Sequence, residues 1–254
     1  MQKPVALVTG GSRGIGAEIV RALAAADMRV AFTFANDEAA ARALALECGA
    51  TNVSCERSDV GDPHAHAPLV AATLERYDRL DVLVNNAGIF GENPFDGDDY
   101  NAWRAGWKRT FEINLFGAVD LAFHAMHAMR AQAPGPRGVR GRVVNVVSRA
   151  AHRGERTFAD YGASKAALVN FTKSIARGCA RDGIVAFAVA PGFIATDMAA
   201  ESLSTSGDHI RNEIPSGRVG EPSEVASIVA FLASGGADYA TGTTIDVNGA
   251  SYVR

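Results

Sequence analysis

The stretch VALVTGGSRGIGAEIVRALAAA, residues 5–26, reads as a strand, a glycine-rich turn and a helix in direct succession. Its first part, VALVTG (5–10), is a short apolar run of the kind found in strands that are buried on both faces. Residues 15–26 then place apolar side chains at helical spacing. A strand that turns directly into a helix indicates the first unit of an alternating α/β fold.

The same alternation continues along the rest of the chain. Further strands are predicted at 29–34, 52–57, 80–86, 142–147, 184–191 and 243–247. Further helices are predicted at about 37–48, 67–77, 98–111, 115–130, 161–180 and 222–234. Seven strands separated by helices predict one α/β domain over residues 1–254, a doubly wound parallel sheet with helices on both faces. Ligands of such sheets bind beyond the carboxyl ends of the strands.

The composition excludes several classes of protein. A net charge of −3 and the absence of a dense basic stretch argue against a nucleic-acid partner. The three scattered cysteines show no metal-ligand spacing, so we expect neither a disulfide framework nor a metal site. No apolar run approaches membrane-spanning length, and the N-terminus runs directly into a strand pattern. We therefore expect a soluble, cytoplasmic protein without a membrane partner.

The glycine-rich turn TGGSRGIG, residues 9–16, is a candidate phosphate site. Gly10, Gly14 and Gly16 give the pattern G-x-x-x-G-x-G, which differs from both the G-x-G-x-x-G fingerprint and the P-loop. Glycines here would let a phosphate approach the amide groups at a helix N-terminus. The alternative is a flexible strand–helix connection without a ligand.

Polar residues also follow the later strands. Asp59 follows the third strand, the NNAG segment (85–88) the fourth, Ser148 the fifth, and APGFIATDM (190–198) the sixth. These residues can face a ligand, but Asp and Asn also cap turns at such places. Asn114 falls in the helical region after the fourth strand.

The segment DYGASKAALVNF, residues 160–171, places Tyr161 four residues before Lys165 on one side of a predicted helix. Such a pair occurs by chance on many helices, where its stems cover surface. The chemical alternative is that the ammonium lowers the pKa of the phenol toward the operating pH, which would make the pair a general acid/base.

Taken together, these motifs resemble those of the short-chain dehydrogenase/reductase family over essentially the whole chain, and most of all its 3-oxoacyl-carrier-protein reductase branch. The matching motifs, in order, are TGGSRGIG, Asp59-Val60, NNAG, Asn114, Ser148, YGASK and PGFIATDM, with Ser148 placed 13 residues before Tyr161. The resemblance implies a Rossmann-type fold and an oxidoreductase that interconverts a ketone and a secondary alcohol.

The resemblance also implies roles for individual residues. Tyr161 would exchange a proton with the substrate oxygen, Ser148 would polarise that oxygen, and Lys165 would lower the tyrosine pKa and hold the nicotinamide ribose. Asn114 would relay protons through water to Lys165. The implied cofactor-binding residues are Gly10, Ser12, Arg13, Gly14, Ile15, Gly16, Asn36, Asp59, Val60, Asn86, Ala87, Gly88, Tyr161, Lys165, Pro191, Gly192, Ile194 and Thr196.

The end of the second strand favours NADP(H) over NAD(H), although NAD(H) is possible. NAD-specific relatives carry an acidic residue there, whereas this chain has Phe34, Ala35 and Asn36. Asp37 is expected to start a helix. Arg13 can bind a 2′-phosphate through charge-assisted hydrogen bonds, unless it is merely a solvated loop residue.

Two segments depart from the family pattern. The connection APGPRGVRG (133–141) is longer than expected and is placed at the end of the sheet away from the strand tips. Beside the catalytic serine, Arg149, His152, Arg153 and Arg156 either contact an acidic substrate or carrier, or face solvent or an interface.

The substrate stays open at this point. The alternatives to a 3-oxoacyl thioester are a sugar, polyol, steroid or secondary-metabolite alcohol, with selectivity expected in loops 89–100 and 195–216. A catalytically silent dinucleotide sensor is the alternative outside enzymes. Apolar surface on the helices 115–130 and 161–180 predicts a homotetramer.

Overall fold

The computed structural model describes residues 2–253, and within them all side chains except those at 198, 201–203 and 206. It confirms the predicted seven-stranded parallel sheet, whose strands lie in the order β3-β2-β1-β4-β5-β6-β7. The strands are β1 (Val5–Val8), β2 (Arg29–Phe34), β3 (Val53–Arg57), β4 (Val82–Asn85), β5 (Gly141–Val146), β6 (Ile184–Pro191) and β7 (Thr244–Val247).

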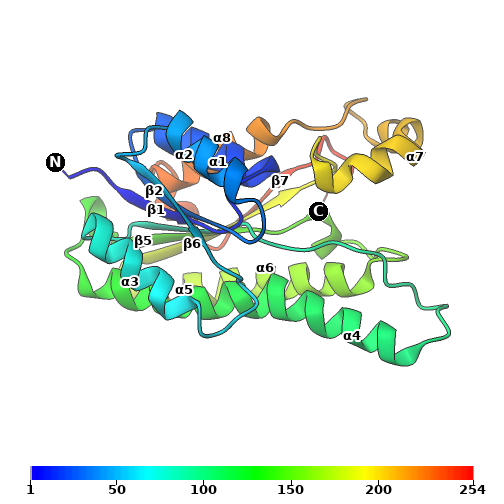
Figure 1. Cartoon of the computed structure of the whole chain (residues 1–254), viewed down its shortest axis with the longest axis horizontal. Helices are drawn as coiled ribbons and strands as arrows, with labels where there is room; N and C mark the ends of the chain where they lie inside the picture. The colour runs from blue at the N-terminus through cyan, green and yellow to red at the C-terminus, as the bar shows by residue number, and fades with distance from the viewer. Residues whose placement is uncertain (1, 254) are drawn as a thin grey trace.

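Helices cover both faces of this sheet (Figure 1). On one face lie α1 (Gly14–Ala25), α2 (Glu38–Glu47) and α8 (Pro222–Ala233). On the other lie α3 (His66–Tyr77), α4 (Tyr100–Phe111), α5 (Gly117–Ala131) and α6 (Ala159–Cys179). Helix α7 (Asp197–Glu213) lies beyond one end of the sheet, near the C-terminus.

The apolar strands fit a sheet that is buried on both sides. In β1, all four residues are fully buried, but they alternate between two cores. Ala6 and Val8 belong to the core under α1 and α8, whereas Val5 and Leu7 belong to the core under α3 and α5. Because successive side chains of a strand point to opposite faces, one short apolar run can anchor helices on both.

The sheet reverses its order at β1, which pairs with β2 on one side and with β4 on the other. The two connections therefore leave the sheet in opposite directions, and their first residues diverge at the carboxyl ends of β1 and β4. Such a reversal opens a crevice suited to a ligand. This places the glycine-rich turn and the NNAG segment beside each other.

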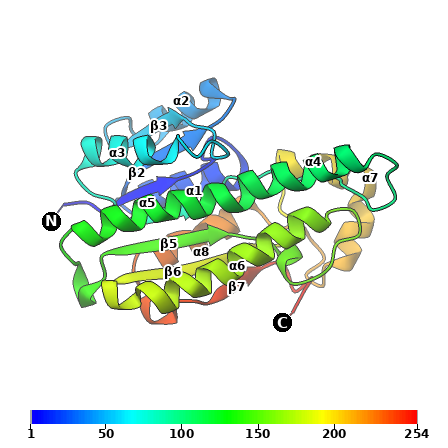
Figure 2. The same ribbon diagram turned by 90° about the horizontal axis from the view of Figure 1, so that it is seen from below.

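The helical region around Asn114 differs from the prediction of two separate helices. Helices α4 and α5 are joined without a break by a π-helical turn, η1 (Glu112–Phe116), and together they form the long helix in Figure 2. A π turn inserts one extra residue into a helix and is frequent at functional sites. It contains Asn114.

Two further segments that the sequence predicts as loops contain helical turns. Much of the predicted loop 195–216 is helix α7, which begins directly after Thr196. The 133–141 connection contains a single 3₁₀ turn, η2 (Pro136–Gly138), and leads into the start of β5. It therefore lies at the amino ends of the strands, away from the crevice.

Within residues 2–253, no helix combines the length and the apolar character needed to cross a membrane.

Candidate active site

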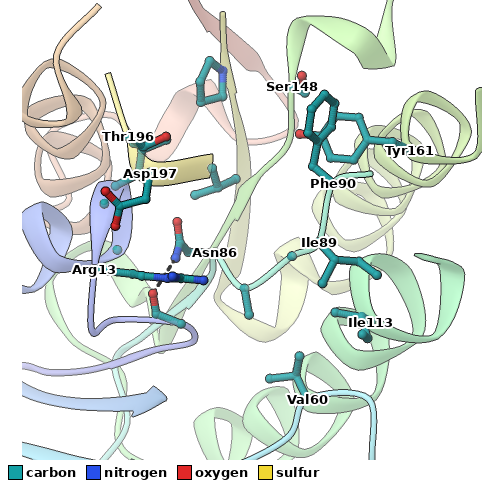
Figure 3. A pocket seen from close by; sticks show the side chains of 18 of the residues that line it. Arg13, Val60, Asn86, Ile89, Phe90, Ile113, Ser148, Tyr161, Thr196 and Asp197 are labelled. Atoms are coloured by element: carbon teal, nitrogen blue, oxygen red, sulfur yellow. Dashed lines mark hydrogen bonds between the residues drawn. The ribbon is translucent and has the colours of Figure 1, made fainter. Parts of the chain in front are cut away.

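A pocket of about 780 Å³ lies at the carboxyl ends of the strands. It gathers the predicted catalytic and cofactor-binding residues, except Asn114, which does not line it. The predicted site residues that line it are Gly10, Ser12, Arg13, Gly14, Ile15, Gly16, Asn36, Asp59, Val60, Asn86, Ala87, Gly88, Ser148, Tyr161, Lys165, Pro191, Gly192, Ile194 and Thr196. Figure 3 shows Arg13 and Asp197 on one side of the pocket and Ser148, Tyr161 and Phe90 on another.

The glycine-rich turn needs glycine for two physical reasons. Gly10 has a φ of +64°, a left-handed conformation that side chains rarely adopt. A Cβ on Gly16 would collide with the carbonyl oxygen of Gly10 and lie 2.6 Å from Asn86 Nδ2. The extended residue Arg13 precedes α1, and its side chain does not cap the helix. The amides of the first turn of α1 therefore lie at the pocket, as an anion site requires.

Hydrogen bonds join this turn to the end of β4. Thr9 Oγ1 accepts from the backbone amides of Asn86 and Ala87, each at 3.0 Å. Asn86 Nδ2 donates back to the carbonyl oxygens of Thr9 and Gly10, also at 3.0 Å. Asn86 thus holds the floor of the crevice in a fixed shape.

Asp37 follows β2 and lines the pocket, and one of its carboxylate oxygens caps the next helix, α2, where it accepts from the amide of Ala40 at 2.9 Å. Asn36 is exposed and lines the pocket. Arg57, which the sequence does not predict as a site residue, also lines the pocket. Its position at the end of β3, in register with Phe34, could have indicated this. Its guanidinium lies 5.4 Å from the centre of the Phe34 ring.

The residues after β3 both line the pocket and form a turn, which are the two roles that the sequence allows. Asp59 lines the pocket, and its Oδ1 also accepts from the amide of Gly61 at 2.9 Å in a turn. Val60 is buried, and its carbonyl oxygen lies 3.1 Å from His66 Nε2. The turn is thereby fixed against the start of α3.

Tyr161 and Lys165 lie on the first turns of α6, beside the end of β5. The Ser148 side chain lowers the pKa of Tyr161, but burial is the larger influence and raises it. The net direction is therefore opposite to the lowering expected from the ammonium, because the fold removes the phenolate from water. At pH 7 the hydroxyl is protonated.

Lys165 is 4% exposed, and its Nζ donates to the carbonyl oxygen of Val146 at 3.0 Å. Burial lowers the pKa of its ammonium to about 8. Nζ lies 5.8 Å from the centre of the Tyr161 ring. A lysine with this pKa can hold or release a proton near neutral pH, unlike a solvated one.

Asn114 lies behind the pocket and is 1% exposed. Its Oδ1 accepts from the amide of Ile89 at 2.8 Å, and its Nδ2 donates to the Ile89 carbonyl oxygen at 3.0 Å. A Cβ on Gly88 would lie 3.1 Å from Asn114 Oδ1 and 3.4 Å from Lys165 Nζ. The π turn, the NNAG segment and α6 therefore meet at Gly88 with no room for a side chain.

The segment 191–196 closes the pocket on the far side of β6. The amide of Gly192 donates to the carbonyl oxygen of Val247 at 2.9 Å, which ties this segment to β7. Ile194 is buried and forms a bridge with Gly220. Thr196 precedes α7, so the position of that helix depends on this segment.

The charged segment after Ser148 separates into different environments. Arg149 is 6% exposed and lines the pocket, with its guanidinium 4.5 Å from the centre of the Phe193 ring. Arg153 instead pairs with Glu155 at 3.3 Å, and Arg156 is exposed. The ring of His152 stacks on Tyr252. Arg149 is thus neither a solvated side chain nor a member of a surface cluster.

Comparison with known proteins yields matches over nearly the full length. A family model described as enoyl-(acyl carrier protein) reductase matches residues 10–250. Acetoacetyl-CoA reductase of Shinella zoogloeoides is 38% identical over 249 residues, which cover 98% of each chain. The 3-oxoacyl-[acyl-carrier-protein] reductase of Escherichia coli K12 is 36% identical, with 98% of this chain and 97% of that protein covered.

Solved structures give the same result. A Brucella melitensis protein described as a short-chain dehydrogenase/reductase of the glucose/ribitol dehydrogenase type superposes with a TM-score of 0.90 at 32% identity. It covers 100% of this chain and 98% of its own. A 3-oxoacyl-[acyl-carrier protein] reductase of the same organism, in complex with NAD, superposes with a TM-score of 0.90 at 34% identity. That match covers 100% of this chain and 99% of the other.

Proposed function

Because this chain belongs to the short-chain dehydrogenase/reductase family, we propose that it is an NADP(H)-dependent enzyme that interconverts a ketone and a secondary alcohol. It is an oxidoreductase that acts on CH–OH and C=O groups, as its relatives are. The observation that carries the proposal is the grouping of Ser148, Tyr161 and the buried Lys165 at one end of a pocket whose other end is the glycine-rich turn (Figure 3).

The pocket fits a nicotinamide dinucleotide. Gly10 and Gly16 let the turn pack closely against Ala87 and Asn86, and the backbone at the start of α1 lines the pocket, where its amides can bind a pyrophosphate. Asp59 and Val60 would flank the adenosine, and Lys165 would hold the nicotinamide ribose. The 191–196 segment would contact the remaining part of the dinucleotide. A bound nicotinamide dinucleotide supplies the hydride of the reaction.

The chain's own residues would handle the proton and the charge on the substrate oxygen. Tyr161 keeps its proton at neutral pH because burial raises its pKa, so it can donate to an oxygen that gains negative charge during reduction. Ser148, which lies beside Tyr161 (Figure 3), would donate to that oxygen as well. Donors fixed in advance around a developing alkoxide stabilise the transition state more than the ground state.

Lys165 would restore the proton of Tyr161. Its pKa of about 8 lies closer to neutrality than that of a solvated lysine, which favours proton exchange over a permanent charge. Asn114 would support this route from behind the pocket, since its amide fixes the backbone of Ile89 next to Gly88. In this proposal, Asn114 positions the proton path and does not touch the substrate.

The preference for NADP(H) is supported by two cations and by the position of Asp37. Arg13 and Arg57 both line the pocket near the end of β2 and can donate to a 2′-phosphate, with Asn36 as a neutral donor. Arg57 already donates to Glu38 at 3.1 Å, so Arg13 is expected to contribute more. The carboxylate of Asp37 is engaged in capping α2. Direct titration should give a lower Kd for NADPH than for NADH, and the reverse order would contradict the assignment.

A 3-oxoacyl thioester is the first substrate class to test, because relatives at 36–38% identity are 3-oxoacyl-[acyl-carrier-protein] and acetoacetyl-CoA reductases. An alcohol of a sugar, polyol, steroid or secondary metabolite is the alternative. The experiment follows NADPH absorbance with acetoacetyl-CoA and a panel of neutral and acidic ketones, and uses Tyr161→Phe as the inactive control. No turnover with any of them would favour a dinucleotide sensor.

A homotetramer is the proposed assembly. Exposed aromatic side chains lie on two separate parts of the surface. Phe116 and Phe123, on η1 and α5, are 47% and 57% exposed. Phe231 on α8 is 52% exposed, and Tyr239, which follows it, is fully exposed. Two distinct patches repeated by two-fold axes would give a closed tetramer. The cytoplasmic location stays a prediction from the sequence.

A further inference from the structure

Arg149 occupies an unusual place for a cation. It begins the 3₁₀ turn η3 (Arg149–Ala151), directly after Ser148, and is 6% exposed. Its Nη1 is buried and has no hydrogen-bond partner among the described residues. A buried polar group without a partner is destabilising, and a buried charge more so. Such a group calls for a reason other than the stability of the fold.

A largely buried arginine on β5 shows what a structural role requires. Arg142 on β5 forms two parallel hydrogen bonds to the carboxylate of Asp238, both at 2.8 Å. Its side chain is 16% exposed and that of Asp238 is 9% exposed. The fold can therefore satisfy a buried guanidinium with a carboxylate. It does not do so at Arg149 in the part of the chain that the structure describes.

The acidic side chains nearest to Arg149 are engaged elsewhere. Glu155, on the same segment, pairs with Arg153, and Glu213, at the end of α7, lies 3.2 Å from His209. Burial and the charge of Arg153 lower the pKa of Arg149, while the two glutamates raise it to a smaller extent. The pocket thus holds a guanidinium that no carboxylate of these segments neutralises.

The neighbours of Arg149 show in which part of the pocket it lies. Its guanidinium lies over the ring of Phe193, whose segment also lines the pocket. Phe90 and Phe158 stack at 4.2 Å between ring centres, and Phe90 meets the ring of Tyr161 edge-on at 5.1 Å. Near Tyr161 the pocket therefore combines an apolar aromatic wall with the guanidinium of Arg149, and Glu155 also lines it. Arg149 directly follows Ser148, the serine that would bind the reacting oxygen.

We propose that Arg149 binds a carboxylate carried by the substrate itself, so that the preferred substrate is an oxo acid or hydroxy acid with an apolar body. A planar carboxylate matches the paired donors of a guanidinium and would satisfy the nitrogen that lacks a partner. The aromatic wall would contact the carbon chain between this group and the carbonyl. The inference rests on the proposed ketone–alcohol activity and specifies its substrate class.

The test compares oxo acids with their methyl esters. The probes are 2-oxobutanoate, acetoacetate and levulinate, which place the carboxylate at three distances from the ketone. For at least one of them, kcat/KM with NADPH should exceed that of the ester by about ten- to a hundredfold, the worth of a charge-assisted hydrogen bond. In Arg149→Met this advantage should disappear, so that the ratio of kcat/KM for the acid to that for its ester falls to about one or below. Arg156→Met, at an exposed position of the same segment, is the matched control and should keep the advantage.

A binding measurement separates this inference from the proposed activity. Calorimetric titration with each acid and its ester needs no turnover, and Arg149→Met should weaken binding of the preferred acid tenfold or more. Reduction of neutral ketones without any preference for the acids would refute the role of Arg149 and leave the ketoreductase proposal intact. Absence of all turnover would refute the ketoreductase proposal instead, and the titration would still decide on Arg149. If Arg149→Met does not fold, competition of the acids against ester turnover in the unaltered protein decides: no inhibition by any acid would refute the proposal.

Discussion

Replacing Lys165 by methionine should change how the stability of the protein depends on pH. The ordinary pKa of lysine is 10.5, and burial lowers that of Lys165 to about 8. Between these two pH values the unfolded chain keeps a proton that the folded chain has lost, so folding becomes more favourable as the pH rises. Below pH 8 both states are charged, and the penalty of burying the ammonium is fully present.

The size of the effect follows from the two pKa values. At 1.36 kcal/mol for each pH unit, the gap corresponds to about 3 kcal/mol over the whole window, of which about 2 kcal/mol appears between pH 7 and pH 9.5. Lys165→Met keeps the volume of the stem but has no group that titrates. The free energy of unfolding of the unaltered protein, minus that of Lys165→Met, should therefore rise by about 2 kcal/mol between pH 7 and pH 9.5.

Urea denaturation at several pH values, with each variant measured against the unaltered protein in the same buffer, gives this difference. Titration of all other groups is common to both proteins and cancels. Lys173→Met, on the exposed side of α6, serves as the control, and its difference should stay constant. A difference for Lys165→Met that is flat within about 0.5 kcal/mol, or that falls with pH, would show that Lys165 is not the buried cation that its proposed proton exchange requires.

Further predictions concern single residues and the assembly. Tyr161→Phe should lower turnover by roughly two to four orders of magnitude with little change in NADPH affinity, and more than a third of the original turnover would point to another donor. Arg13→Ala should weaken NADPH binding about ten- to a hundredfold in a fluorescence titration and hardly change NADH binding; equal losses for both would exclude a 2′-phosphate contact. Arg142→Met should lower the free energy of unfolding by about 3–5 kcal/mol because it leaves Asp238 buried and unpaired, whereas Arg149→Met should cost far less. Light scattering should give the mass of four chains, and a monomer at micromolar concentration would refute the tetramer.

The sequence predicts the sheet well because each strand carries its own signal. A short apolar run such as 5–10 fits a strand buried on both faces, and all four residues of the observed strand Val5–Val8 are buried. The positions of the candidate site follow from the topology, since parallel strands bring their carboxyl ends to one edge. This is why a residue near the N-terminus, such as Arg13, and one near position 196 line the same pocket.

The features that the sequence does not predict depend on contacts between distant segments. Arg149 lies in a segment whose charged composition is typical of a solvated loop. Its guanidinium nevertheless packs against Phe193, which follows another strand. The pKa of Tyr161 is set by the apolar surroundings that the fold creates and not by Lys165 four residues away. Helix α7 has a mostly polar sequence, and the π turn at Asn114 is an irregularity within a helix that residue spacing alone cannot distinguish from a break.

The segment between β5 and α6 separates the reaction from the choice of substrate. Its two ends, Ser148 and Tyr161, are held beside each other by strand β5 and helix α6, so their placement depends mainly on these two elements (Figure 3). Its interior contributes Arg149 and Phe158, which line the pocket next to these ends. A change inside this segment can therefore alter the group that is bound beside the carbonyl and leave the proton transfer in place. On this reasoning, η3 determines the preference for an acidic substrate, while β5 and α6 determine the proton transfer.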